Sequence, residues 1–342
     1  MKKIIFYIIL FCLLAANTAG AAEFIDGRIR LVIHENTGRF SLYYMADIAR
    51  EEYLPFFFDE DPRTSFISLM VNNRSFRMGD STFFRTRLGG TAQNPAIIFE
   101  SATITLTQEF SFIRTGTSAQ TNGVRINFTI ANRSEQSIES GLRFLIDTHL
   151  SEENLPHFIT DRQEISGETL FDNSTADRYW ASENTRLALM GSIGGEHLSR
   201  PDYILFANWK RLNDVPWKPS SIVPGRNFNL QPYSMNDSSV CYYFEPITIP
   251  QGGSRTISIA LSSKDIRGFD QSRIQGGFIP AAGGEELEID DERINSIRND
   301  LLILQSMAIR LDSFLFSGVI PEDELAAMEL LISTIKSKYG IP

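Results

Sequence analysis

The chain has only four histidines, and two of them lie near acidic residues with which they could perform acid–base chemistry. His149 and His157 flank Glu152 and Glu153, just after an apolar run that ends in Asp147. An imidazole beside a carboxylate is sufficient for proton transfer. If the protein is an enzyme, the catalytic candidates are Asp147, His149, Glu152 and His157. The same residues also suit a hydrogen-bonded strand end followed by an acidic loop, and we favour this structural interpretation.

Other catalytic and metal-binding patterns are missing or incomplete. The two histidines match no common metal-ligand spacing, and Asp59-Glu60-Asp61 is followed by Pro62, which breaks the EF-hand pattern. Cys241 lies in an apolar run typical of a buried, inert thiol. No Gly-x-Ser-x-Gly elbow or phosphate-binding glycine loop occurs. We predict no metal and no cofactor; paired carboxylates for glycoside hydrolysis stay open because their diagnostic is a distance in space.

A group of aromatic residues is the other candidate site. Tyr203, Trp209 and Trp217 lie within fifteen residues of one another. Exposed rings of this kind stack on sugars, whereas buried rings fill a core. They are therefore candidate ligand-binding residues for a glycan, with packing as the alternative.

The amino terminus reads as a cleavable secretory signal. Lys2 and Lys3 precede the apolar run 4–16, and Ala19-Gly20-Ala21 fits the small-residue cleavage pattern. The run is too short to span a bilayer, which needs about twenty apolar residues. We expect cleavage near Ala21 or Ala22, a periplasmic or secreted product, and no transmembrane segment in the mature chain.

Charge and cysteine content narrow the class of protein further. The formal net charge is -10 and no block of Lys or Arg occurs, which disfavours a nucleic-acid partner. Removal of the signal would remove Cys12 and leave Cys241 as the only cysteine, so no intramolecular disulfide is possible. The fold must then be stabilised by its core.

Residues 23–262 have the pattern of a large antiparallel β-sandwich. Short alternating segments are separated by turns such as Glu35-Asn36-Thr37-Gly38 and Asn72-Asn73-Arg74. Val124 to Ile130 alternates apolar and polar residues, and Leu142 to Ile146 is richer in apolar residues, as expected of a central strand. We place the connection between the last two strands at Pro246 to Gly253.

The pattern changes to helical near the carboxyl terminus. Residues 263–289 contain several Gly and Pro residues and read as a linker, and 290–342 read as a helical hairpin with apolar residues three and four apart. The second helix is expected to open at Pro321. Apolar residues beyond the two seams would form a face for a protein partner: Leu302, Ile309, Phe314, Phe316 and Leu330.

Two stretches carry a resemblance to a known group of proteins. Gly123-Val124-Arg125-Ile126 to Asn132-Arg133-Ser134, followed by Gly141-Leu142-Arg143-Phe144-Leu145-Ile146-Asp147-Thr148, resembles an element of exported bacterial β-sandwich proteins. The sandwich looks galactose-mutarotase-like or immunoglobulin-like, and some members look like periplasmic envelope or flagellar-collar components. The resemblance implies fold and location. In mutarotases two histidines and a carboxylate act on the sugar ring, and His149 and His157 do not align with that pattern.

These observations favour a non-enzymatic periplasmic interaction or scaffold protein of the cell envelope, possibly associated with the flagellum. An envelope protein partner is expected to bind the C-terminal helices. The alternative is a carbohydrate-binding or carbohydrate-active sandwich that uses Trp209, Trp217 and the loop from Asp147 to His157.

Overall fold

The structure is a computed structural model that describes residues 21–58, 61–116, 118, 120–153, 155–195, 197–265, 268–269 and 322–339. Its described residues fall into two compact units. The first runs to Ala46 and resumes at Tyr53, and the second comprises Asp47–Glu52 and the carboxyl-terminal helix. Most of the predicted signal, most of the linker and the first predicted helix of the hairpin lie outside the described residues.

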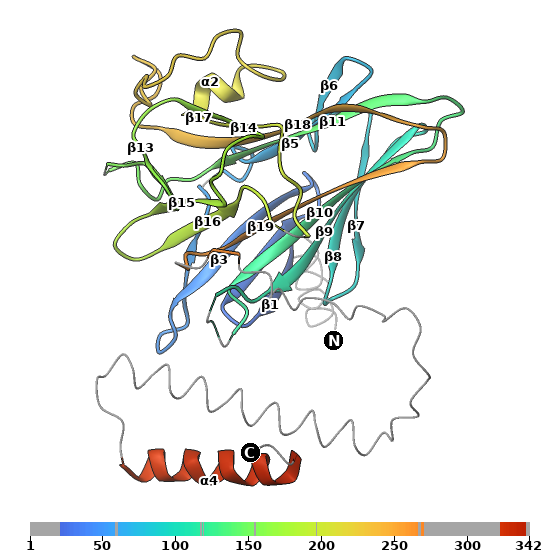
Figure 1. Cartoon of the computed structure of the whole chain (residues 1–342). Helices are drawn as coiled ribbons and strands as arrows, with labels where there is room; N and C mark the ends of the chain where they lie inside the picture. Colours follow the sequence, from blue (N-terminus) through green and yellow to red (C-terminus); the bar gives the residue numbers. More distant parts are fainter. Residues whose placement is uncertain are drawn as a thin grey trace, which may run out of the picture. The chain divides into compact units, whose positions relative to one another are not determined.

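The described chain is mainly β-structure, and its strands pair antiparallel in every sheet, as the sequence predicted (Figure 1). Three sheets are described: a four-stranded sheet with order β1-β2-β3-β4, a nine-stranded sheet with order β13-β12-β15-β16-β19-β10-β9-β8-β7, and a six-stranded sheet with order β14-β17-β18-β11-β5-β6. The first ten strands are β1 (Ala21–Asp26), β2 (Ile29–His34), β3 (Arg39–Asp47), β4 (Glu52–Pro55), β5 (Phe66–Val71), β6 (Arg74–Arg77), β7 (Arg85–Gly90), β8 (Pro95–Glu100), β9 (Ile104–Ile113) and β10 (Gly123–Asn132). The remaining strands are β11 (Ile138–Asp147), β12 (Phe158–Thr160), β13 (Glu164–Ile165), β14 (Thr169–Asp172), β15 (Tyr179–Glu183), β16 (Ala188–Ser192), β17 (Tyr203–Asn208), β18 (Ser238–Ile249) and β19 (Ser254–Ser263).

Two hairpins have the turns that the sequence indicated. β2 pairs with β3 across a turn in which Gly38 has φ +60°, a conformation that only glycine adopts without strain. β5 pairs with β6 across Asn72 and Asn73, whose φ angles are 46° and 64°. A tight two-residue hairpin turn requires positive φ at both central residues, because this conformation matches the twist of the two strands. Asparagine tolerates positive φ better than most residues.

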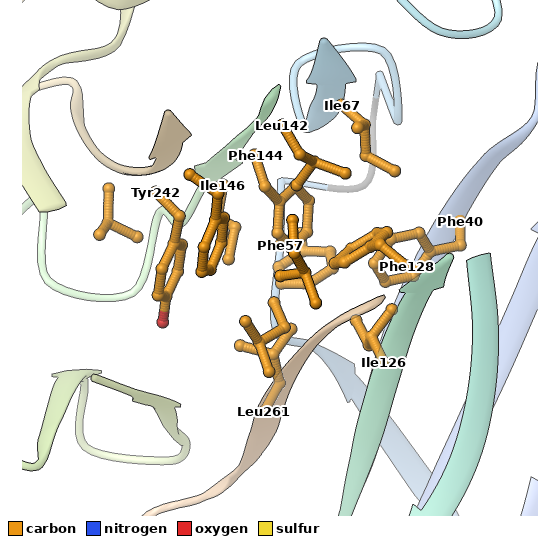
Figure 2. Packing of buried hydrophobic residues seen from close by; sticks show 14 of the residues in the cluster. Phe40, Phe57, Ile67, Ile126, Phe128, Leu142, Phe144, Ile146, Tyr242 and Leu261 are labelled. Atoms are coloured by element: carbon orange, nitrogen blue, oxygen red, sulfur yellow. The ribbon is translucent and has the colours of Figure 1, made fainter. Parts of the chain in front are cut away.

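The main core lies between the six-stranded and nine-stranded sheets. Figure 2 shows Phe144 of β11 among Phe40, Phe128 and Tyr242, which come from three other strands. Ring pairs at 4.9 to 6.5 Å between centroids fill this layer. No disulfide braces the described residues, so burial of these rings supplies the main stabilisation.

The last two strands are longer than the sequence suggested. β18 continues to Ile249, so Pro246 is a strand residue and the connection to β19 shortens to Pro250–Gly253. Proline is tolerated there because β11 and β18 lose register between Ser140 and Leu142, and a bulge needs no donor at that point. Apolar alternation alone could not reveal this bulge.

One face of the six-stranded sheet is turned away from the main core, and we call it the outer face. A smaller buried cluster defines it: Phe66, Leu145, Leu205, Ala207, Leu212, Cys241 and Tyr243. The short helix α2 (Trp209–Asn213) covers this face and contacts β11, β17 and β18. Its Asn208 cap accepts a hydrogen bond from the Arg211 N–H. The β-pattern of residues 23–262 gave no sign of this five-residue helix.

The second unit contains one described helix, α4 (Glu322–Tyr339), close to the predicted start at Pro321. The described residues therefore contain one helix of the expected hairpin, and the hairpin itself is not confirmed. Met328 is buried, whereas Leu325 and Ile332 of the same predicted seam are each 42% exposed. No described helix is long and apolar enough to cross a membrane.

Candidate functional site

The candidate site lies at the end of β11 on the outer face. Asp147 is the last residue of this strand and is 6% exposed. Its side chain points to the outer face because it alternates with Leu145, which packs there. Asp147 pairs with Ser239 of β18, and this pairing brings the residue before β18, Asp237, to the same edge.

Three carboxylates converge at this edge. Asp147, Glu152 and Asp237 each offer an oxygen, and these oxygens lie within 4.8 Å of one another. Glu152 and Asp237 are partly buried, so the cluster is open to solvent on one side. We call these three residues the carboxylate cluster.

Burial and mutual repulsion hold protons on the carboxylate cluster. Burial, with a smaller contribution from the charge of Asp237, raises the pKa of Asp147 to about 7. Burial and the charges of Asp237 and Asp147 raise the pKa of Glu152 to about 8. Burial also raises the pKa of Asp237. Near neutral pH the cluster therefore retains at least one proton and can donate as well as accept it.

Neighbouring groups fix the orientation of the carboxylates. A side-chain hydrogen bond with Thr64 acts against the rise in the pKa of Asp147, and the Ser234 hydroxyl donates to Asp237 at 2.7 Å. The Ser238 backbone N–H donates to Glu152. All three carboxylates are thus held by at least one donor from the protein.

His157 lies behind the carboxylate cluster rather than in it. The residue is 3% exposed, its ring packs at a tilt against Phe228 with 4.6 Å between centroids, and its Nδ1 lies 2.9 Å from the Ser238 hydroxyl oxygen. Burial lowers the pKa of His157, which favours the neutral ring. Ser238 therefore contacts His157 through its hydroxyl and Glu152 through its backbone N–H.

His149 packs against Phe58, and the aromatic candidate Trp209 lies beside the carboxylate cluster. The His149 ring packs edge-on against Phe58 at 6.3 Å. Trp209 adjoins the carboxylate cluster, because its backbone N–H donates to the Asp237 carbonyl and its Nε1–H donates to the Thr64 carbonyl, both at 2.9 Å.

Trp217 and Tyr203 lie further along the outer face. The Trp217 ring packs edge-on against Tyr243 at 6.0 Å, and Lys218 covers the Tyr203 ring. Tyr243 is about four residues along β18 from Ser239, the partner of Asp147. Both candidates are partly buried and pack on the outer-face cluster, so the three aromatics do not form one exposed platform.

The carboxylate cluster permits a restricted range of chemistry. Oxygens within 4.8 Å of one another can enclose a hard cation such as Ca²⁺, which takes oxygen ligands at about 2.3 to 2.6 Å. A protonated carboxyl beside an ionised one can exchange a proton with a hydroxyl-rich ligand. The spacing is nearer to the about 5 to 5.5 Å between the carboxyls of a retaining glycosidase than to the about 6.5 to 9.5 Å of an inverting one.

The sequence analysis identified two members of the cluster and missed the third. Asp147 and Glu152 are neighbours in sequence, whereas Asp237 joins them only through the pairing of β11 with β18. The polar dipeptide Asp237-Ser238 directly before an apolar strand was a weak sequence signal for a site. In the structure Asp237 accepts from Ser234, and Ser238 contacts His157.

The predicted partner-binding residues are described in part. Leu302, Ile309, Phe314 and Phe316 lie outside the described residues. Leu330 of α4 is 69% exposed.

Fold and site together define a mainly-β protein with antiparallel sheets and a carboxylate cluster at a sheet edge. No protein-family model and no curated protein matches the chain. Solved structures with limited similarity include a galactose mutarotase-like protein from Lactobacillus casei, with TM-score 0.43 and 8% identity over 72% of this chain and 100% of that one. An aldose epimerase homologue from C. elegans gives TM-score 0.44 and 6% identity, over 72% of this chain and 98% of that one. A galactose mutarotase related enzyme from Lactobacillus acidophilus gives TM-score 0.41 and 8% identity, over 75% of this chain and 100% of that one. Scores at this level assign neither a family nor an activity to the chain.

Proposed function

We propose that this chain is a non-enzymatic interaction or scaffold protein of the cell envelope that binds a protein partner through its C-terminal helical region. The observation that carries the proposal is the apolar surface of α4. Four large apolar side chains are exposed there: Leu325, Leu330, Leu331 and Ile332.

The positions of these side chains around the helix favour a partner. Successive helical residues turn by about 100°, so Leu330 lies nearly opposite the buried Met328. Leu330 is thus exposed opposite a buried residue, and Leu325, Leu331 and Ile332 are exposed within about 60° of Met328. Apolar side chains exposed together on one helix mark an interaction site. An apolar groove on an envelope protein would supply the missing cover.

The test is a single charge on the exposed side of α4. We expect Leu330→Glu in the full chain to abolish co-purification of the partner from envelope extracts, because a carboxylate cannot enter an apolar groove. Ser333→Glu is the matched control, since Ser333 is also an exposed residue of α4. Equal partner recovery by both variants would reject the proposal.

A second candidate function is carbohydrate binding or processing at the carboxylate cluster. It is favoured by the convergence of Asp147, Glu152 and Asp237 beside Trp209. Carboxylates accept hydrogen bonds from sugar hydroxyls, and an indole provides a stacking surface.

A glycan array separates the two candidates. Carbohydrate recognition at the cluster predicts that Glu152→Gln and Trp209→Ala lose a glycan signal that Trp217→Ala retains, because Trp217 packs on Tyr243 instead. Absence of any glycan signal in the unmodified protein would exclude this second function.

A further inference from the structure

A cluster of arginines on the outer face is not used by either proposed function. Three guanidinium groups lie over the ring of Phe66: Arg77 at 3.5 Å, Arg143 at 5.6 Å and Arg39 at 5.7 Å from its centroid. They come from β6, β11 and β3, which are far apart in sequence. We call Arg39, Arg77 and Arg143 the arginine cluster.

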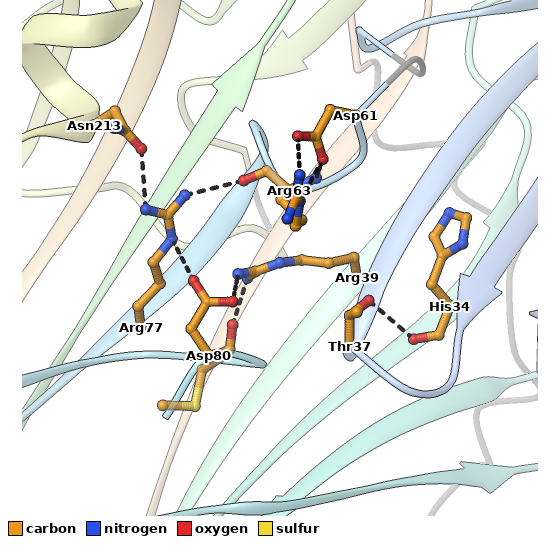
Figure 3. Close-up of polar contacts among 9 residues, drawn as sticks. His34, Thr37, Arg39, Asp61, Arg63, Arg77, Asp80 and Asn213 are labelled. Atoms are coloured by element: carbon orange, nitrogen blue, oxygen red, sulfur yellow. Dashed lines mark hydrogen bonds and ion pairs between the residues drawn. The ribbon is translucent and has the colours of Figure 1, made fainter. Parts of the chain in front are cut away.

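Positive charge exceeds negative charge in this cluster. Asp80 is shared between Arg39 at 2.9 Å and Arg77 at 3.0 Å (Figure 3). Asp61 also lies in this region and forms a bidentate ion pair with Arg63, at 2.8 and 2.7 Å (Figure 3). Among the described residues, one carboxylate thus serves the three guanidinium groups.

Arg143 is held by neutral partners. It is 1% exposed and donates to the carbonyls of Leu212 and Val215 and to the Cys241 sulfur. Burial raises the pKa of Cys241, so this thiol stays neutral and supplies no counter-charge. A buried cation without an ionic partner is costly to the fold.

A cavity of about 330 Å³ opens beside the guanidinium groups of Arg77 and Arg143. Its lining includes Phe66, Ser68, Ser75, Arg77, Arg143 and Asn213. Asp214 also lines it, but this carboxylate is paired with Lys210 at 2.8 Å. The cavity therefore presents cations and hydroxyl groups to a molecule the size of a small organic acid.

We propose that this cavity binds an oxyanion, namely the carboxylate, sulfate or phosphate group of a small ligand. The planar fork of a guanidinium matches the paired oxygens of such groups, and a negative charge here would offset the excess of positive charge. Burial, with repulsion by Arg39 and Arg143, lowers the pKa of Arg77 to about 10, as expected of a cation that lacks sufficient negative neighbours. The proposal is independent of partner binding by α4 and of the carboxylate cluster.

The test uses the full chain and three oxyanions: sulfate, phosphate and glucuronate. At constant ionic strength, at least one of them raises the melting temperature in a saturable way that chloride and neutral glucose do not reproduce. The three arms also distinguish an inorganic anion from a sugar acid. An identical response to chloride would mean simple screening of the arginines and would overturn the proposal.

Variants locate the effect at the cavity. Arg77→Met weakens the saturable response at least tenfold, whereas Arg133→Met leaves it unchanged, because Arg133 is 53% exposed and pairs with Glu100 elsewhere. Arg77→Lys keeps the charge but removes the planar guanidinium. It should lower the oxyanion affinity several-fold, and it replaces Arg77→Met in the test if the methionine variant does not fold. Equal affinity in Arg77→Lys, Arg133→Met and the unmodified protein rejects the site.

Discussion

Arg143 of the arginine cluster and Asp147 of the carboxylate cluster lie on the same face of the same sheet, yet the two clusters do not neutralise each other. Arg143 and Asp147 are both on β11, with Leu145 between them on the outer face. Four residues of strand separate them by about 13 Å, which is beyond the range of an ion pair. Each cluster collects like charges where stability alone would pair opposite ones. Under the two binding proposals, the polar groups of each cluster would serve a ligand rather than the fold.

Removal of the buried cation should have the largest effect on stability. Arg143→Ala leaves the carbonyls of Leu212 and Val215 without their donor and creates a cavity under α2. Two carbonyls without a donor, together with the cavity, outweigh the relief of a buried charge, so we expect a loss of about 3 to 5 kcal/mol in the free energy of unfolding, measured by urea denaturation. Arg133→Ala, at an exposed arginine, should change it by no more than about 0.5 kcal/mol. Equal stabilities would show that Arg143 supports no packing at all.

The carboxylate cluster should make stability fall as pH rises. The folded-state pKa values of Asp147 and Glu152 are raised to about 7 and about 8, so their contribution is fully present below pH 4 and is lost as pH rises through those values. From pH 5 to pH 9 we expect the unmodified protein to lose about 2 to 4 kcal/mol relative to Asp147→Asn/Glu152→Gln, after allowance for solvent exposure.

The control for this pH series is a pair of exposed residues. Glu135→Gln/Glu139→Gln removes two exposed carboxylates, one in the turn before β11 and one near the start of β11. It should retain the pH slope of the unmodified protein. A flat profile in the unmodified protein would mean that the three carboxylates are well solvated and not coupled.

A carboxylate introduced at Asn213 should give the smallest change in stability and the sharpest change in binding. Asn213 Oδ1 accepts from Arg77 at 3.0 Å, so Asn213→Asp places a fixed negative charge where an oxyanion would bind. The nearby Asp214 opposes this gain, so we expect a shift below about 1 kcal/mol. Oxyanion affinity, measured by calorimetry, should fall at least tenfold. Unchanged affinity would place the anion outside the cavity.

The sequence predicted the layers better than the sites. Alternation in Val124 to Ile130 and the apolar run at Leu142 to Ile146 follow directly from which face of a strand is buried, and β10 and β11 are both confirmed. The bulge opposite Pro246 depends on the register of two strands, which alternation does not fix.

Both clusters depend on contacts between distant segments. Asp147 and Glu152 could be grouped because they are close in sequence, but Asp237 is brought in by the pairing of β11 with β18. The arginines looked like ordinary solvated residues because no block of basic residues occurs. One signal was present: Arg143 interrupts an apolar run that was predicted to be a central strand, and a charge there must be buried.

The central claim is that the three residues of the carboxylate cluster are buried together and repel one another. A titration of the carboxyl groups in the folded protein tests it most directly. Carbon-13 NMR of the side-chain carboxyls should give midpoints near 7 for Asp147 and near 8 for Glu152, with Glu152 shifting downward in Asp237→Asn because a repelling charge is removed. Midpoints near 4 for both residues, unchanged by Asp237→Asn, would contradict a buried and mutually repelling cluster.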